Sequence, residues 1–208
     1  MRKFFANIDH TRLKAILLKL DFEPKIYTLL CKYIDTSEGL PLGYQTSQLF
    51  ALLFLDRFDH YVKEVLHIRY YGRYMDDFFL ICPDREYLQF CLREINAFMA
   101  VIGLELNEKT HIFPLKNGIN FLGFHTYLTD TGRVIRKLRR SSLKKMRAKL
   151  RYWEKAYPAG EVTREAILES WQAWDAHAAH GNTWQLRREV WQQVQDILKE
   201  EIKWHSHS

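Results

Sequence analysis

Two adjacent aspartates, Asp76 and Asp77, are the residues of this chain best suited to metal chemistry. Tyr74 and Met75 precede them and Phe-Phe-Leu-Ile follows, so the sequence predicts a β-hairpin with both carboxylates at its tip. Two carboxylates held on an apolar hairpin repel each other unless cations offset their charge. Their hard oxygen atoms suit Mg²⁺, with Mn²⁺ as a substitute. Two such ions about 3.5–4 Å apart can activate a hydroxyl group and stabilise a leaving pyrophosphate. The alternative is a solvated acidic turn without metal.

A basic segment follows in the second half of the chain. Residues 131–153 contain no acidic residue, and the whole chain of 208 residues has a formal charge of +6. The segment predicts a polyanionic partner, although a solvated helix face would have the same composition. Its basic residues are Arg133, Arg136, Lys137, Arg139, Arg140, Lys144, Lys145, Arg147, Lys149 and Arg151.

The elements that must position these groups predict an α+β fold. Apolar spacing favours helices over residues 9–34, 46–65 and 84–101, with Asp9 as an N-cap. Residues 67–81 favour the hairpin, and residues 104–113 and 120–127 favour short strands. From Arg133 the chain is expected to be helical to its end, with breaks at residues 157–160 and 181–182. The predicted boundary between the two parts lies near residue 132.

The remaining composition favours a cytoplasmic protein. Cys31, Cys82 and Cys91 form no CxxC pair and are expected to be reduced. No apolar run is long enough to cross a membrane, and no N-terminal signal segment is present, so no membrane partner is expected. All six tryptophans lie at or after Trp153 and are expected to pack inside the helical region.

The sequence Tyr74-Met75-Asp76-Asp77 resembles the YxDD box of reverse transcriptases. Four further blocks resemble that family in the expected order: residues 2–10, 39–48, 106–110 and 121–124. The resemblance implies a polymerase palm over residues 1–132, an antiparallel sheet backed by helices with the fingers missing, and a helical thumb over residues 133–208. Within that family, the chain most resembles bacterial retroelement enzymes of the diversity-generating or group II intron type, with retrons as rivals, which implies a bacterial or phage origin. The tail resembles theirs at Ser170, Trp171, His177, His180, Asn182, Trp184, Leu186 and Arg187.

The resemblance implies a role for each matched residue. Asp76 and Asp77 would be catalytic metal ligands, and Lys109 would assist pyrophosphate departure, unless it is an ordinary surface lysine. Phe5 would be an aromatic steric gate, unless it only packs in the core. The residues implied in nucleotide binding are Phe5, Leu42, Gly43, Gln48, Tyr74 and Met75. Those implied in primer and template binding are Phe121, Leu122, Gly123, Arg139, Arg140, Lys144 and Lys145.

The chain departs from the family pattern in two places. An aspartate that the family carries before the first palm block would lie just upstream of Met1, so the sequence is expected to be N-terminally truncated and inactive as written. Leu42 stands where most relatives have glutamine. Leucine cannot donate a hydrogen bond to the incoming sugar, and looser positioning would reduce discrimination between nucleotides.

These features predict an RNA-directed DNA polymerase module that transfers deoxynucleotides by a two-metal mechanism. Its implied partners are an RNA template, a DNA primer, deoxynucleoside triphosphates and a small basic accessory protein. The alternative is a non-catalytic, nucleic-acid-binding remnant of such an enzyme. A third hypothesis, a basic structural protein with an incidental Asp-Asp turn, conflicts with the five ordered blocks.

Overall fold

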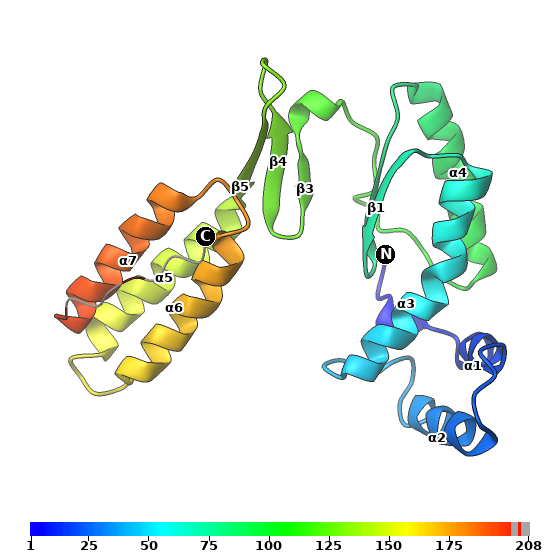
Figure 1. The fold of residues 1–208 in the computed structure, drawn as a ribbon, viewed down its shortest axis with the longest axis horizontal. Coiled ribbons are helices and arrows are strands. Elements are labelled where there is room, and N and C mark those ends of the chain that lie inside the picture. The colour runs from blue at the N-terminus through cyan, green and yellow to red at the C-terminus, as the bar shows by residue number, and fades with distance from the viewer. Residues whose placement is uncertain (201–203, 205–208) are drawn as a thin grey trace. The chain divides into compact units, whose positions relative to one another are not determined.

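The computed structural model describes residues 1–200 and Trp204. The chain divides into two compact units, Met1–Phe113 and Pro114–Ser208, and each is described by itself (Figure 1). Both combine helices with a small antiparallel sheet, which confirms the α+β class. None of the helices in the described part of the chain has the length and apolar character needed to span a bilayer.

The first unit consists of helices around one β-hairpin. A short 3-10 turn, η1 (Phe5–Asn7), leads into α1 (His10–Leu18) and α2 (Pro24–Ile34). Helix α3 (Gln45–His60) continues into one π-helical stretch, η2 (Tyr61–Val65). The hairpin strands β1 (Tyr70–Tyr74) and β2 (Asp77–Ile81) follow, and α4 (Arg85–Val101) completes the unit.

The expectation of one helix over residues 9–34 was wrong, because the chain breaks there into α1 and α2. Pro24 occupies the start of α2, where its fixed φ and missing N–H are tolerated, whereas inside a continuous helix it would remove a hydrogen bond. The predicted cap of α1 is confirmed, since the Asp9 carboxylate accepts a hydrogen bond from the Arg12 N–H at 2.7 Å.

The hairpin is backed by α3 and α4 through a cluster of aromatic rings. Phe58 of α3 is fully buried. Its ring centroid lies 6.1 Å from Tyr71, 5.2 Å from Phe78 and 5.7 Å from Phe98. Alternate residues of a strand point to opposite faces, so the same pattern leaves Tyr70 and Tyr74 exposed. One face of the sheet is thus fixed to the helices, and the other carries exposed tyrosines.

Two strand and helix expectations were wrong. Residues 104–113 form no strand, because the Asn107 side chain accepts a hydrogen bond from the Lys109 N–H at 3.0 Å and turns the chain. Residues 134–138 are a strand rather than part of a helix. Val134 and Ile135, which suit strands, pair there with Leu128 and Tyr127 of the preceding strand.

The second unit is a three-stranded meander followed by three helices. After a 3-10 turn, η3 (Leu115–Asn117), strands β3 (Ile119–Phe121), β4 (Phe124–Leu128) and β5 (Val134–Leu138) pair in sequence order. Helices α5 (Arg140–Ala156), α6 (Arg164–Ala178) and α7 (Trp184–Leu198) follow. Both predicted helix breaks are confirmed, whereas the helix expected over residues 201–203 and 205–208 lies outside the described residues.

Tryptophans form much of the core of this second unit. Trp153, Trp171 and Trp191 are buried together with Ile167 and Val194, as the sequence predicted for them. Trp184 is the exception, because 58% of it is exposed. A second cluster joins Phe124 and Leu138 of the sheet to Ala178 of α6. The sheet therefore packs with the helices that follow it. The assignment of palm and thumb to residues 1–132 and 133–208 stays a prediction.

Gly39 supplies a test of how the first unit is assembled. A Cβ atom there would lie 2.6 Å from Ala6 Cα, and the residue has φ +66. Gly103 has φ +79 but no neighbour within 4 Å. Both alanine substitutions incur about 1–2 kcal/mol of left-handed backbone strain. We expect Gly39→Ala to lower the free energy of unfolding by a further 1–3 kcal/mol or so through overpacking. Urea unfolding measures both, and equal losses would contradict the close contact.

Candidate active site

The predicted hairpin tip is confirmed. Tyr74 pairs with Asp77 at the last rung of the ladder, so Met75 and Asp76 form a two-residue turn. Met75 has φ +52, as a tight hairpin connection requires of a central residue. The Asp76 side chain is 38% exposed, and Asp77 is exposed. Both carboxylates can therefore be reached from solvent.

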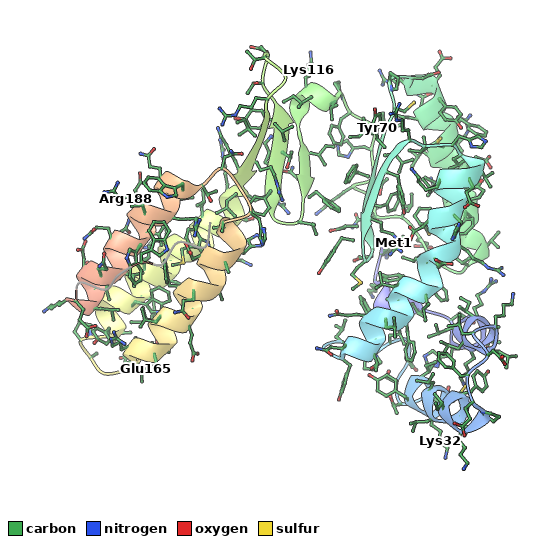
Figure 2. All side chains as sticks on the ribbon, in the orientation of Figure 1. Met1, Lys32, Tyr70, Lys116, Glu165 and Arg188 are labelled. Atoms are coloured by element: carbon green, nitrogen blue, oxygen red, sulfur yellow. The ribbon has the colours of Figure 1, made fainter. Side chains whose placement is uncertain are left out.

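The first residues of the chain lie beside this turn. The Met1 amino group donates a hydrogen bond to Asp76 O at 3.0 Å and lies 3.7 Å from Asp76 Oδ2. Figure 2 shows Met1 near the turn end of the hairpin and Tyr70 at the opposite end. The next residue, Arg2, donates its N–H to Glu105 O at 3.0 Å. Residues 1 and 2 therefore contact both the turn that contains Asp76 and the segment that leads to Lys109.

Residues 39–48, one of the blocks that resemble the family, adjoin the same N-terminal segment. The Leu40 N–H donates to Phe5 O at 2.7 Å, and Gly39 lies so close to Ala6 that a side chain would not fit. The Phe5 ring is partly buried and lies edge-on to the buried Phe4, with centroids 5.4 Å apart. Phe5 therefore has a packing contact, and its role as a steric gate stays a prediction.

Several predicted residues make no contact with the carboxylates. Leu42 is 77% exposed, and Gly43 has open space around it with φ +91. Gln48 is exposed on α3, and Lys109 is exposed on the turn made by Asn107. Within residues 1–200, no hydrogen bond or ion pair joins these side chains to Asp76 or Asp77. Tyr74 and Met75, in contrast, flank the carboxylates directly.

Sequence reasoning missed Arg73, which connects the turn to Asp59 of α3. Arg73 donates from Nε to Asp59 Oδ1 at 2.6 Å, pairs through Nη2 with Asp59 Oδ2, and donates from Nη1 to Met75 O at 3.0 Å. Tyr71 donates its hydroxyl to Asp59 Oδ1 at 2.6 Å. The available signal was strand alternation, which puts Arg73 on the same face as Tyr71, where a charged residue needs a partner.

The protonation of this group follows from its surroundings. Burial opposes the charge of Arg73, but the hydrogen bond and the charge of Asp59 more than offset it, so the pKa of Arg73 is raised. Burial, together with the hydrogen bond to Asp59, raises the pKa of Tyr71 well above its usual value. The guanidinium is therefore a fixed cation, and the phenol keeps its proton at neutral pH.

The turn suits an ion that is shared with a phosphate-bearing ligand. Nowhere in the described residues do three or more His, Cys, Asp or Glu side chains gather as a metal site. Mg²⁺ in proteins is commonly held by one or two carboxylates, with waters and substrate phosphates completing its octahedron. Asp76 and Asp77 supply that number of carboxylates, and Arg73 does not compete for them because Asp59 already neutralises it.

The second unit places the other predicted residues around a second tight turn. Phe121 pairs with Phe124, so Leu122 and Gly123 form the turn between β3 and β4, with φ +48 and +82. A Cβ atom on Gly123 would lie 2.7 Å from His177 Nε2. The Arg139 N–H donates to Gly123 O at 3.0 Å. Gly123 is therefore required by contacts within the protein, and the turn adjoins the start of α5.

The start of α5 carries an unbalanced positive charge. Its first turn has no acidic residue, and Arg139 at the N-cap makes no capping bond through its side chain. Cations are unfavourable at the positive end of a helix dipole, whereas an anion there is stabilised. The predicted basic residues Arg139, Arg140, Lys144 and Lys145 are all exposed. This helix end is suited to bind phosphate groups.

The matched residues of the tail have structural roles. The Asn182 side-chain oxygen accepts the Arg136 N–H at 2.8 Å, and the backbone N–H of Asn182 donates to Arg136 O at 2.8 Å. Arg187 forms a buried bidentate pair with Asp175 at 2.7 and 2.8 Å. These contacts fix α6 and α7 to each other and to the edge strand β5.

Comparison with known proteins gives one match. The model of the family described as reverse transcriptase (RNA-dependent DNA polymerase) matches residues 1–126, which is more than half of the chain. Among curated proteins, none matches significantly.

The raised pKa of Tyr71 leads to a test in alkaline solution. Folded Tyr71 holds its proton to a higher pH than the unfolded chain, whose tyrosines titrate near pH 10. Its contribution to the free energy of unfolding is therefore complete below about pH 10 and declines as the pH rises further. We expect the stability difference between the native chain and Tyr71→Phe to shrink as the pH rises above about 10. Denaturant unfolding measures it, and a constant difference would contradict the buried phenol–Asp59 contact.

Proposed function

Because this chain belongs to the reverse transcriptase family, we propose that it is the palm and thumb module of an RNA-directed DNA polymerase. Its Asp76 and Asp77 would hold the divalent ions for deoxynucleotidyl transfer. The observation that carries the proposal is the pair of solvent-accessible carboxylates at the hairpin tip, Asp76 in the turn and Asp77 at the start of β2, with the Met1 nitrogen within hydrogen-bond distance of Asp76 O.

The chemistry divides between the ions and the chain. When bound, Mg²⁺ or Mn²⁺ would lower the pKa of a primer 3′-hydroxyl and neutralise the charge of the leaving pyrophosphate. Asp76 and Asp77 would bind the ions at the tip, where solvent and a triphosphate can both reach them. The N-terminal segment adjoins this tip, since the Met1 nitrogen lies 3.0 Å from Asp76 O.

The nucleotide would be contacted by residues on the same side of the first unit. The backbone hydrogen bond from Leu40 to Phe5 holds residues 39–48, which include Leu42, Gly43 and Gln48, against residues 2–10. Phe5 would limit the space beside the sugar, and Lys109 would approach the leaving phosphates from its exposed turn. The open surroundings of Gly43 leave room for a base pair.

The primer and template would bind through the second unit. The β3–β4 turn, which contains Leu122 and Gly123, is bonded to the N-terminal end of α5. The exposed cations of that helix end would track a phosphate backbone, because such contacts give affinity and register without sequence choice. A retroelement origin of the diversity-generating or group II intron type, and a basic accessory protein, remain finer proposals supported by Leu42 and the tail residues.

The second candidate is a nucleic-acid-binding remnant without catalysis. It is favoured because, among the described residues, only two carboxylates come together at the candidate metal site. Nucleic-acid binding by the basic start of α5 would need no further group. Only the polymerase candidate predicts that loss of a carboxylate reduces primer extension. Both candidates predict that loss of the basic residues of α5 weakens nucleic-acid binding.

We expect Asp76→Asn to reduce Mg²⁺-dependent primer extension by more than about 100-fold in the natural protein that contains this sequence. Partners of metal ligands alone typically contribute 10–100-fold or so, and a ligand contributes more. Template binding should be unchanged. Asp21→Asn is the matched control, because Asp21 is exposed and has φ +51, which asparagine tolerates. Equal extension by both variants would reject the metal-ligand assignment.

Neutralising the start of α5 tests the nucleic-acid contact. With Arg139, Arg140, Lys144 and Lys145 all replaced by Gln, primer–template binding should weaken. The slope of log K against log salt should flatten by about 3–4, since each duplex phosphate contact contributes roughly 0.9. The matched control replaces four exposed basic residues of the first unit, Arg12, Lys19, Lys25 and Lys32. An unchanged slope in the α5 variant would place the contact elsewhere.

A further inference from the structure

We propose that Arg73 and Asp59 are positioning residues that set the affinity of the Asp76–Asp77 turn for divalent ions. The proposal rests on the metal site of the proposed function and adds two residues to it that touch neither ion nor substrate. They act through the backbone of the turn, and the name Arg73–Asp59 clamp is used below for this pair.

The clamp joins the turn to a rigid helix. Arg73 forks onto both oxygens of Asp59 and uses its remaining terminal nitrogen to bind Met75 O at 3.0 Å. The Arg73 side chain is only 7% exposed, so these bonds are shielded from water. Asp59 follows the fully buried Phe58 on α3, and the Tyr71 hydroxyl also holds its carboxylate. Asp59 is therefore fixed from two sides.

The bonded carbonyl belongs to the peptide that links the two turn residues. Met75 O and the Asp76 N–H lie on one planar peptide unit, so fixing the carbonyl fixes where the Asp76 backbone begins. Met75 has φ +52, a left-handed conformation that is strained for a non-glycine residue and that a contact can stabilise. The clamp supplies such a contact at the residue preceding the carboxylate.

The charge of the clamp is arranged so that it does not replace the metal. An unpaired arginine next to the turn would neutralise Asp76 and compete with a cation. Here Asp59 neutralises Arg73, and only one N–H reaches the turn, at a carbonyl rather than at a carboxylate. The Met1 amino group lies 3.7 Å from Asp76 Oδ2, and Arg73 adds no second cation at the carboxylates, whose oxygens suit a divalent ion.

A lysine cannot reproduce this geometry. Its ammonium is a compact point charge, whereas the planar guanidinium offers donors in a fixed fork. Arg73→Lys would keep the charge and lose the simultaneous grip on Asp59 and Met75 O. Outer partners of metal ligands typically contribute about 10–100-fold to metal affinity, so the loss should be large enough to measure.

The test is a Mn²⁺ titration followed by the electron paramagnetic resonance signal of the free ion, with no nucleotide or nucleic acid present. Three variants are compared with the native chain, each at a temperature where circular dichroism shows it fully folded. Arg73→Lys is the clamp variant, and Asp59→Asn replaces it if Arg73→Lys does not fold. Tyr87→Phe is the control, because it removes a partly buried hydrogen bond to Leu66 O, 2.8 Å long, in the same unit. Asp76→Asn tests the metal site itself.

We expect the clamp variant to raise the Kd for Mn²⁺ about 10-fold or more, Tyr87→Phe to leave it unchanged, and Asp76→Asn to abolish binding. A native Kd in the clamp variant, with binding lost in Asp76→Asn, overturns the clamp proposal and leaves the metal site intact. Equal binding by the native chain and Asp76→Asn overturns the proposed function itself. A lower melting temperature alone does not support the clamp, since the control is expected to share it.

Discussion

The first unit holds two adjacent carboxylates at one end of its hairpin. Asp76 lies in the two-residue turn, and Asp77 begins β2, where it pairs with Tyr74. Adjacent carboxylates favour a bound cation, and their position depends on a restrained backbone. The restraint comes from Arg73 and Asp59, and a divalent ion is the partner that the exposed oxygens suit.

The remainder of the first unit connects that tip to the segments around it. Phe58 fixes the inner face of the hairpin to α3 through Tyr71 and Phe78. The N-terminal segment then lies between the tip and Glu105. Because Gly39 has no side chain, residues 39–48 can pack closely against the backbone of Phe5 and Ala6. Residues that are distant in sequence therefore surround the carboxylates because of a few close backbone contacts, and the second unit contributes a separate basic surface at α5.

The sequence predicted those parts that depend on local patterns. The hairpin tip, the Asp9 cap and the breaks between the last three helices follow from neighbouring residues, and all are confirmed. The strand expected over residues 104–113 was wrong because one side-chain bond of Asn107 outweighs the strand preference of its neighbours. The helix expected at Arg133 was wrong because strand pairing with β4 captured residues 134–138.

Pairs that form only in three dimensions were beyond sequence reasoning. Nothing local joins Asp59 to Arg73, or Gly123 to His177, because each pair depends on the docking of one element on another. Gly123 illustrates the difference. The resemblance to reverse transcriptases placed it among the primer- and template-binding residues, which stays a prediction, and the structure adds a contact within the protein, the ring of His177.

The most direct measurement of the central claim is a crystal soaked with Mn²⁺ and examined by anomalous scattering. The account predicts an anomalous peak about 2.0–2.3 Å from a carboxylate oxygen of Asp76 or Asp77, at a distance typical of hard cations bound by oxygen. A well-occupied peak elsewhere, with none at the turn, would contradict it.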